Sequence, residues 1–317
     1  MATVMVTGAC GLIGERVCSG LLKKHNVVVA VDNEESEYNA GKENYHFYQA
    51  APNDKDKYSA IFEKEQVDYL VHLACSADND FGHIITEKEM QISRECDNFL
   101  FKLAISKEVF KIMVLSTTQV YVTPDSREPI REGDDEKPVT NYAKMKSETE
   151  HTFASDVSRM NNMVCAIMRI PPVYTLEYHD NLLAKITDPK DRTCFVYRTG
   201  EYGFAFCCVH NLADFILCYL RQADSSAYTG VYNIADKNLI MASEIITFVR
   251  QNGRLGPVLQ RNPGKDTITS IFKKFGNKEE KTNYRYLDFS TMMYNTMYDT
   301  NKASRMCPFR WDIYNTK

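Results

Sequence analysis

Residues 4–14 read Val-Met-Val-Thr-Gly-Ala-Cys-Gly-Leu-Ile-Gly, a short apolar run that leads into three glycines at Gly8, Gly11 and Gly14. The first glycine allows a tight turn after a strand, the second lets backbone N–H groups approach a ligand, and the third lets a helix pack closely against the sheet. A helical apolar pattern follows, and a second apolar run, 27–31, ends at Asp32. This order of strand, glycine turn, helix, strand and acid predicts a dinucleotide site.

Asp32 indicates which dinucleotide the turn binds. The helix N-terminus after the turn offers partial positive charge to a pyrophosphate, and a carboxylate about twenty residues further on accepts hydrogen bonds from the hydroxyls of an adenosine ribose. Asp32 would repel a 2′-phosphate, and no Arg or Lys follows it before Lys42. The sequence therefore predicts NAD as the cofactor. We expect NAD to contact Gly8, Cys10, Gly11, Leu12, Ile13, Gly14, Asp32, Asn33, Leu73 and Ala74.

The composition is that of a globular protein with a small-molecule substrate. The chain has 317 residues, of which 44% are hydrophobic and 25% are charged, and its net charge is -4. This modest charge gives no reason to expect nucleic acid as a partner. No apolar run approaches the roughly 18 residues that cross a membrane, and no basic segment opens the chain as in a secretion signal. We therefore expect a cytoplasmic protein without a membrane partner.

The ten cysteines and seven histidines do not show the spacing of a metal site. No Cys-x-x-Cys pair occurs, and no two histidines stand four apart with an acid between them. Most cysteines lie inside apolar runs, where a free thiol behaves as a small hydrophobe. We therefore expect reduced core thiols and no metal, with Cys10 as the exception to watch because it lies in the glycine turn.

Strand patterns alternate with helical patterns along much of the chain. Continuously apolar strands separated by helices predict an α/β fold, a Rossmann-type doubly wound parallel sheet with its ligands at the carboxyl ends of the strands. Beyond residue 170 the pattern loosens, with short helices at 211–221 and 242–251, and this predicts a smaller C-terminal substrate-binding cap. The expected strands are 3–7, 27–31, 45–49, 69–74, 112–116, 164–169 and 231–234.

These patterns predict two domains. The NAD-binding Rossmann domain is expected over 1–170, with a returning segment at about 205–235, and the cap over 171–204 and 236–317. The stretch 273–281 mixes charges of both signs, which predicts an exposed turn.

Tyr142 and Lys146 are four residues apart, so they share one face of the helix predicted there. A Tyr-x-x-x-Lys spacing also arises by chance, and the two side chains could equally be solvated residues of an ordinary helix. Their position after the strand that ends in Ser-Thr-Thr, 116–118, makes the pair informative.

The chain resembles the extended short-chain dehydrogenase/reductases, the NAD-dependent epimerase/dehydratase family. The order and spacing of the matching segments are specific to that family and extend across most of the chain. They are the glycine turn at 7–14, Asp32, Asp-Tyr-Leu-Val-His-Leu-Ala at 68–74, Ser-Thr-Thr-Gln-Val-Tyr at 116–121, Tyr142-x-x-x-Lys146, Met-Arg-Ile-Pro-Pro-Val-Tyr at 168–174, and weaker matches at 209–213 and 231–235.

The resemblance implies a role for each matched residue. Tyr142 would be the general acid/base, and because a free phenol has a pKa of about 10, it needs the cation of Lys146 to stabilise its phenolate. Both would also contact NAD. Thr117 would orient the substrate hydroxyl, although Ser116 and Thr118 stand beside it. Thr118 and Arg169 would contact the substrate.

Three departures from the family pattern bear on the substrate. Members that eliminate water carry an acid just after the catalytic Ser/Thr, where this chain has Thr118 and Gln119, so a dehydratase is disfavoured. Pro172 replaces an Asn that is common in sugar-nucleotide enzymes, and 204–206, Phe-Ala-Phe, stands where an Arg-Asp-Phe segment grips the diphosphate. Losing that Arg removes a bidentate phosphate contact unless Arg192 or Arg198 replaces it.

The cap between 174 and 206 is rich in aromatic residues. They form either the core of a small domain or an apolar wall for a less polar substrate. The residues concerned are Tyr178, Phe195, Tyr197, Tyr202, Phe204 and Phe206.

Two enzymatic hypotheses and one binding hypothesis follow from these observations. The first is an NAD-dependent epimerase that acts on a nucleotide sugar through a keto intermediate. The second is a dehydrogenase or ketoreductase for a smaller or more apolar alcohol, and the third is a non-catalytic NAD-binding protein. We also expect a homodimer through the Tyr142 helix and the helix 92–106, whose apolar residues Phe99, Leu100, Leu103 and Ala104 could equally face the protein's own core.

Overall fold

The computed structural model describes residues 1–75, 77, 83–122, 126–157, 163–188, 191–253, 255–261 and 294–316. The charged stretch 273–281, predicted to be an exposed turn, lies outside these residues.

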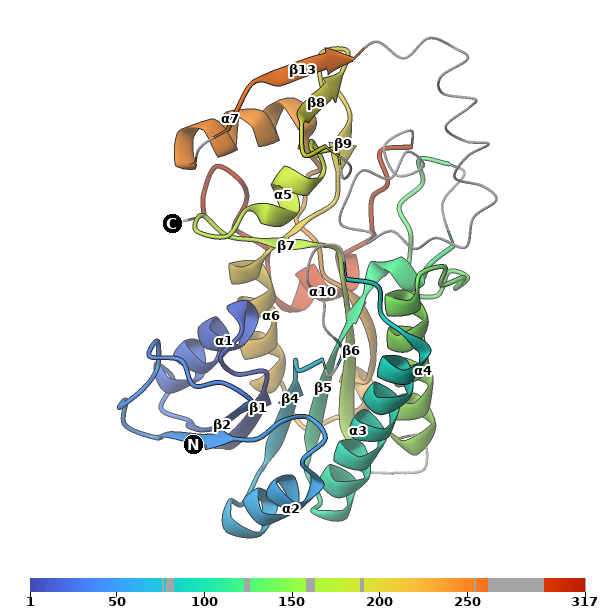
Figure 1. The fold of residues 1–317 in the computed structure, drawn as a ribbon. Coiled ribbons are helices and arrows are strands. Elements are labelled where there is room, and N and C mark those ends of the chain that lie inside the picture. Colours follow the sequence, from blue (N-terminus) through green and yellow to red (C-terminus); the bar gives the residue numbers. More distant parts are fainter. Residues whose placement is uncertain are drawn as a thin grey trace.

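The central feature of the fold is one parallel sheet of seven strands (Figure 1). Every hydrogen-bonded neighbour pair in it is parallel, and the order is β11-β6-β5-β4-β1-β2-β3. Each strand falls on one of the seven apolar runs named above, so the predicted doubly wound sheet is confirmed. The strands are β1 (Thr3–Thr7), β2 (Val27–Asp32), β3 (Tyr45–Gln49), β4 (Tyr69–His72), β5 (Lys111–Thr117), β6 (Val164–Ile170) and β11 (Gly230–Asn233).

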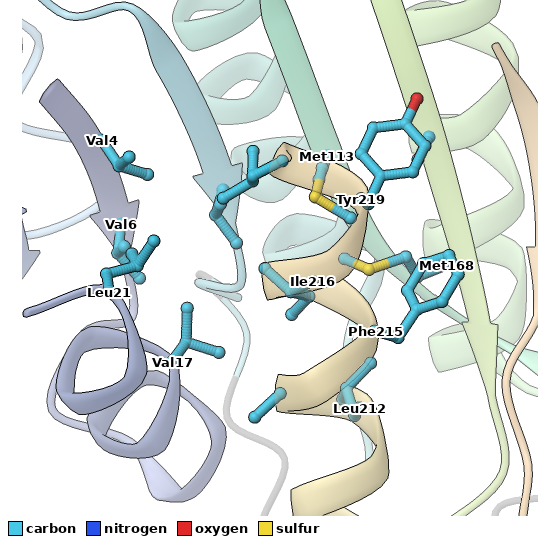
Figure 2. Close-up of a cluster of buried hydrophobic side chains, with 14 of the residues drawn as sticks. Val4, Val6, Val17, Leu21, Met113, Met168, Leu212, Phe215, Ile216 and Tyr219 are labelled. Carbon is cyan, nitrogen blue, oxygen red and sulfur yellow. The ribbon is translucent and has the colours of Figure 1, made fainter. Parts of the chain in front are cut away.

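Helices cover both faces of the sheet because successive strand residues point to opposite sides. Val4 and Val6 join α1 (Leu12–Leu22) and α6 (Val209–Leu220) in one core, which Figure 2 shows. Met5 points to the other face and joins a second core. That core is covered by three helices, α2 (Lys55–Lys64), α3 (Glu87–Ser106) and α4 (Asn141–Val157).

The cap is built from short strand pairs and helices around its own core. β7 pairs with β10, β9 with β12, and β8 with β13. The aromatic residues Phe204 and Phe206 lie inside this core, and Tyr202 packs against it, so for these three the core interpretation is correct. The elements are β7 (Val173–Tyr174), α5 (Asp180–Ala184), β8 (Cys194–Tyr197), β9 (Gly203–Phe204), β10 (Cys207–Cys208), β12 (Ile240–Met241), α7 (Ala242–Asn252) and β13 (Val258–Arg261).

The last helix, α10 (Asn301–Met306), differs from the predicted domain division. It contacts α6 and β11, and Ala303 and Cys307 are buried in the same core as α1 and α6. This part of the expected cap segment 236–317 therefore packs on the sheet domain. The physical reason is that Ala303 and Cys307 find an apolar partner surface on α6, which periodicity within the segment does not reveal.

The apolar residues of α3 serve the protein's own core. Leu100 and Ala104 are 4% and 0% exposed, and Phe99 and Leu103 pack against the same cluster. Of the two orientations considered for these residues, the structure shows the inward one. Among the helices of the described residues, none is long and apolar enough to span a membrane.

Candidate active site

The glycine turn between β1 and α1 has a backbone that side chains would disrupt. Gly8 has a φ of +69°, and a Cβ there would lie 2.9 Å from the backbone nitrogen of Ala74. A Cβ on Gly14 would lie 2.0 Å from the carbonyl oxygen of Gly8. The turn can close against α1 and the end of β4 only because these positions carry no side chain.

Asp32 lies at the end of β2 and is held by backbone groups of the turn. Its Oδ2 accepts the Cys10 N–H at 2.9 Å, and its Oδ1 accepts the Asn33 N–H at 2.8 Å. These two bonds fix the orientation of the carboxylate.

A cavity of about 390 Å³ lies over this turn. Nine of the ten residues named above as expected NAD contacts line it. The tenth, Cys10, donates its backbone N–H to Asp32. The lining consists of Gly8, Gly11, Leu12, Ile13, Gly14, Val31, Asp32, Asn33, Ala50, Pro52, Tyr58, Leu73, Ala74, Cys75, Val173, Tyr178 and Asn181.

The cap contributes three lining residues, Val173, Tyr178 and Asn181. Asn181 is 5% exposed; its Nδ2 donates to the Val173 carbonyl at 2.7 Å, while its Oδ1 has no partner among the described residues. A buried acceptor without a partner is costly unless a ligand supplies the donor. Neither Asn181 nor Tyr58 carries a local sequence signal, so sequence reasoning missed both as lining residues.

The cavity fits a dinucleotide. The three glycines of the turn, Leu12 at the start of α1 and Asp32 all line it, so a helix N-terminus is available to a pyrophosphate and a carboxylate to a ribose. The carboxylate of Asp32, which lines the cavity, would repel the 2′-phosphate of NADP. These residues suit NAD.

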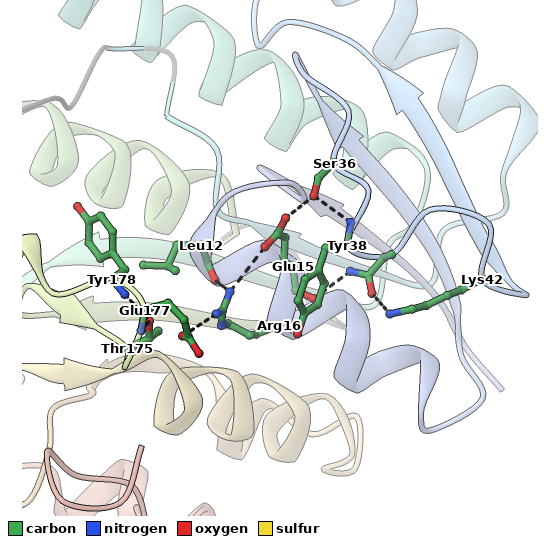
Figure 3. A network of polar contacts seen from close by, with 10 residues as sticks. Leu12, Glu15, Arg16, Ser36, Tyr38, Lys42, Thr175, Glu177 and Tyr178 are labelled. Carbon is green, nitrogen blue, oxygen red and sulfur yellow. Dashed lines mark hydrogen bonds and ion pairs between the residues drawn. The ribbon is translucent and has the colours of Figure 1, made fainter. Parts of the chain in front are cut away.

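A network of polar contacts joins the sheet domain to the cap (Figure 3). Arg16 on α1 lies 3.4 Å from Glu177 and 3.6 Å from Glu15, and Glu15 in turn accepts from the Ser36 hydroxyl. On the cap side, Thr175 Oγ1 accepts the N–H of Tyr178 at 2.9 Å, which orders the loop that carries this lining residue.

The three residues expected to react with the substrate lie beside this cavity rather than in its wall. Thr117 ends β5 and is 3% exposed, and Lys146 on α4 is 4% exposed. Tyr142, one turn before Lys146, packs with Cys75, Ile85 and Met90. β5, β4 and β1 are parallel neighbours in the sheet. Thr117 at the carboxyl end of β5 and the glycine turn at the carboxyl end of β1 therefore lie on the same side of the sheet.

Arg169 lies in a buried ion-pair network. Its Nη2 lies 2.6 Å from Glu150 and also pairs with Glu136, and its guanidinium lies 4.7 Å from the centre of the Tyr121 ring. Hydrogen bonds and charge of Glu150 raise the pKa of Arg169 despite its burial. Its Nε and Nη2 bonds thus fasten β6 to α4, and the cavity wall of the described residues does not include it.

The other predicted substrate contacts are also placed. Thr118 is 4% exposed and its hydroxyl lies 3.5 Å from the carbonyl of Ile170. Arg192 and Arg198 are exposed, and neither lines the cavity as the described residues form it.

The sheet order and the glycine turn define a nucleotide-binding α/β fold, and a family model gives the class. The model of the NAD dependent epimerase/dehydratase family matches residues 4–235. The chain belongs to this family, as its sequence motifs predicted. NAD, expected from the turn and Asp32, is the family's cofactor.

Individual relatives include both dehydratases and epimerases. The chain is 25% identical over 271 residues to dTDP-D-glucose 4,6-dehydratase from Dictyostelium discoideum, covering 77% of this chain but only 61% of that protein. It is 24% identical over 290 residues to Protein CapI from Staphylococcus aureus, covering 82% of this chain and 85% of that protein.

Solved structures share the fold. UDP-glucose 4-epimerase from Bifidobacterium longum, in complex with NAD+ and UDP, has a TM-score of 0.74 at 17% identity, covering 99% of this chain and 95% of that one. UDP-glucuronic acid 4-epimerase from Bacillus cereus, in complex with NAD, has a TM-score of 0.70 at 18% identity, covering 99% and 95%. At these identities the likeness shows the fold alone.

Proposed function

We propose that the protein is an NAD-dependent epimerase that acts on a nucleotide sugar. The proposal is supported by the family's residue set: Thr117 ends β5 at the carboxyl end of the sheet, Tyr142 and Lys146 are one turn apart on α4, and the cavity over the glycine turn suits NAD. The names of the relatives support a nucleotide sugar as the substrate class.

The chemistry needs a proton to move while NAD, when bound, accepts a hydride from a ring carbon and returns it. In our proposal the buried ammonium of Lys146 stabilises Tyr142 as a phenolate, and this phenolate takes the proton of the substrate hydroxyl and becomes the neutral phenol. Thr117 hydrogen-bonds the reacting oxygen. With NAD bound, return of the hydride to the other face of the keto sugar would invert the carbon, and Tyr142 would give the proton back to the oxygen, so no net NADH would form.

The residues after Thr117 favour epimerisation over water elimination. Elimination needs an acid or base to remove a second proton, and the positions that follow are Thr118 and Gln119. Thr140 donates to the Gln119 Oε1 at 3.3 Å, and the Gln119 Nε2 is buried without a partner among the described residues. An amide donor at this place can hydrogen-bond a substrate oxygen but cannot accept a proton from carbon.

A second candidate is a net dehydrogenase or ketoreductase for a less polar alcohol. It is favoured by residue 204, where a phenylalanine buried in the cap core stands in place of the arginine of the Arg-Asp-Phe segment. A diphosphate would therefore lack the bidentate contact that arginine provides.

The experiment incubates the NAD-loaded protein with UDP-glucose or UDP-glucuronic acid and follows the sugar by proton NMR. We expect a C4 epimer to appear without accumulation of NADH. Tyr142→Phe should lose at least about a hundredfold in rate, the size of a general acid/base contribution, while it still binds NAD. Tyr314→Phe, which removes an equally small group from a side chain that is 77% exposed, is the matched control.

Each other outcome has a clear meaning. Stoichiometric NADH with an alcohol substrate would replace the epimerase by the second candidate. Undiminished turnover in Tyr142→Phe would remove Tyr142 from the mechanism. NAD binding without turnover of any nucleotide sugar or alcohol would favour the binding-only protein.

Two further expectations belong to this proposal. The homodimer through α3 and α4 must use the outer surface of these helices, where Arg94 and Glu148 form an ion pair at 2.8 Å, since the apolar residues face inward. Sedimentation at micromolar concentration tests it. Cytoplasmic residence also stays a prediction.

A further inference from the structure

A chain of buried hydrogen bonds connects the glycine turn to α4. Thr7 Oγ1 lies 2.7 Å from His72 Nδ1, and His72 Nε2 lies 3.1 Å from Asp97 Oδ1. Thr149 Oγ1 donates to Asp97 Oδ2 at 2.6 Å. The four residues come from β1, β4, α3 and α4, and each is at most 6% exposed. The reaction proposed above makes no use of Asp97.

This series of hydrogen bonds begins at the glycine turn and ends on α4, the helix that carries Tyr142 and Lys146. Thr7 directly precedes Gly8 of the cofactor turn, and its Oγ1 also lies 3.4 Å from the Ala74 N–H. If Thr7 accepts that N–H, its own hydroxyl proton points to His72 Nδ1, which leaves the Nε2–H for Asp97. Thr149, at the other end, follows Lys146 by three residues, so both lie on one face of α4.

Asp97 is charged in this environment. Burial alone disfavours the charge, but the hydrogen bonds from His72 and Thr149 and the ammonium of Lys146 hold the pKa of Asp97 below its usual value. The titratable groups that face Asp97 are His72 from β4, Lys146 from α4, Tyr58 from α2 and the adjacent Cys96 of α3.

We infer that Asp97 is a positioning residue: its carboxylate, bonded to Thr149 one turn after Lys146 on the same face of α4, limits how strongly this ammonium stabilises the Tyr142 phenolate. Its hydrogen bonds also tie α4 to the cofactor turn through His72 and Thr7. This inference rests on the proposed roles of Tyr142 and Lys146.

The electrostatic consequence has a definite sign. A carboxylate near Lys146 offsets part of the positive potential at Tyr142 and adds a negative potential of its own, so it raises the pKa of the phenol. Removing the charge of Asp97 must therefore lower that pKa. We expect the change in the ionisation constant to be about tenfold, or about one pH unit.

The test is a pH titration of Tyr142 in the full-length protein saturated with NAD. Tyrosine labelled with carbon-13 at Cζ reports phenolate formation by NMR, and Tyr142→Phe assigns the signal. We expect Asp97→Asn to lower the midpoint of Tyr142 by about one pH unit. Asp97→Glu, which restores the charge, should return the midpoint toward that of the wild type.

Thr149→Val is the matched control, because it removes one hydrogen bond to Asp97 and keeps both charges. Its midpoint should stay near that of the wild type. An unchanged midpoint in Asp97→Asn, or an equal shift in Thr149→Val, overturns this role of Asp97.

A reciprocal measurement covers the case in which Asp97→Asn does not fold. In Lys146→Met, the carboxyl carbon of Asp97, assigned by the loss of its label in Asp97→Glu, should titrate about one pH unit higher than in the wild type. An unshifted carboxyl midpoint would contradict the inference. Neither titration needs a substrate, so a shift without epimerase activity would leave the coupling standing and refute the proposed reaction.

Discussion

At the scale of single residues, Gly14 decides whether the cofactor turn can close. The calculated position of a Cβ there is 2.0 Å from the Gly8 carbonyl oxygen and 2.7 Å from the backbone of Ala9. Backbone atoms of a tight turn cannot move aside as the end of a flexible side chain does. The turn therefore requires a residue without a side chain at position 14.

Gly14→Ala should therefore weaken NAD binding strongly. Opening the turn to admit the methyl group costs up to about 3 kcal/mol, which corresponds to about a hundredfold in affinity. Calorimetric titration with NAD measures it. Gly133→Ala is the control, because a Cβ at Gly133 meets no atom within 4 Å. Wild-type affinity in Gly14→Ala would show that the turn is not the cofactor site.

At the scale of elements, α4 is fastened to its surroundings at two successive residues. Thr149 bonds Asp97 of α3, and Glu150 accepts from the Ser116 hydroxyl of β5 and pairs with Arg169 of β6. These contacts fix the rotation of the helix about its axis. They therefore also fix where Tyr142 and Lys146 point, which sequence spacing alone leaves open.

We expect Glu150→Gln to destabilise the protein by about 3 kcal/mol, because it leaves a buried guanidinium short of its counter-charge. Glu148→Gln, two residues away on the same helix, breaks the half-exposed pair with Arg94 and should cost less than about 1 kcal/mol. Urea unfolding of the two variants compares them directly. Equal losses would mean that Glu150 contributes no more than a surface pair.

At the scale of the whole molecule, the cavity is closed by two parts of the chain that are far apart in sequence. The glycine turn and Asp32 come from the sheet domain, and Val173, Tyr178 and Asn181 come from the cap. The bridge between Arg16 and Glu177 spans the same boundary, but its carboxylate is 71% exposed, so it contributes little stability.

NAD binding should therefore protect amides in both parts. We expect slower hydrogen exchange in peptides that cover 8–14 and in peptides that cover 173–181, since a ligand held between two segments suppresses the opening of each. Mass spectrometry of the protein with and without NAD measures this, with α7 as the internal reference. Protection of 8–14 alone would show that the cap loop does not close on the cofactor.

The sequence by itself determined the parts that depend on local backbone and periodicity. The alternation of strand and helix patterns placed all seven strands of the sheet. Inner strands such as β1 and β2 are continuously apolar because they are buried on both faces. The glycine turn with Asp32 located the cavity that we propose for NAD, because only glycine tolerates the close approaches of that turn.

Only the tertiary structure decided which distant residues meet. It brought Asn181 into the cavity wall and paired Arg169 with Glu150 of α4 in a buried ion pair. It also placed α10 on the sheet domain and brought Asp97 within hydrogen-bond distance of His72. These contacts span from about twenty to more than a hundred residues of chain. No periodicity encodes them, because each depends on the packing of complete elements against one another.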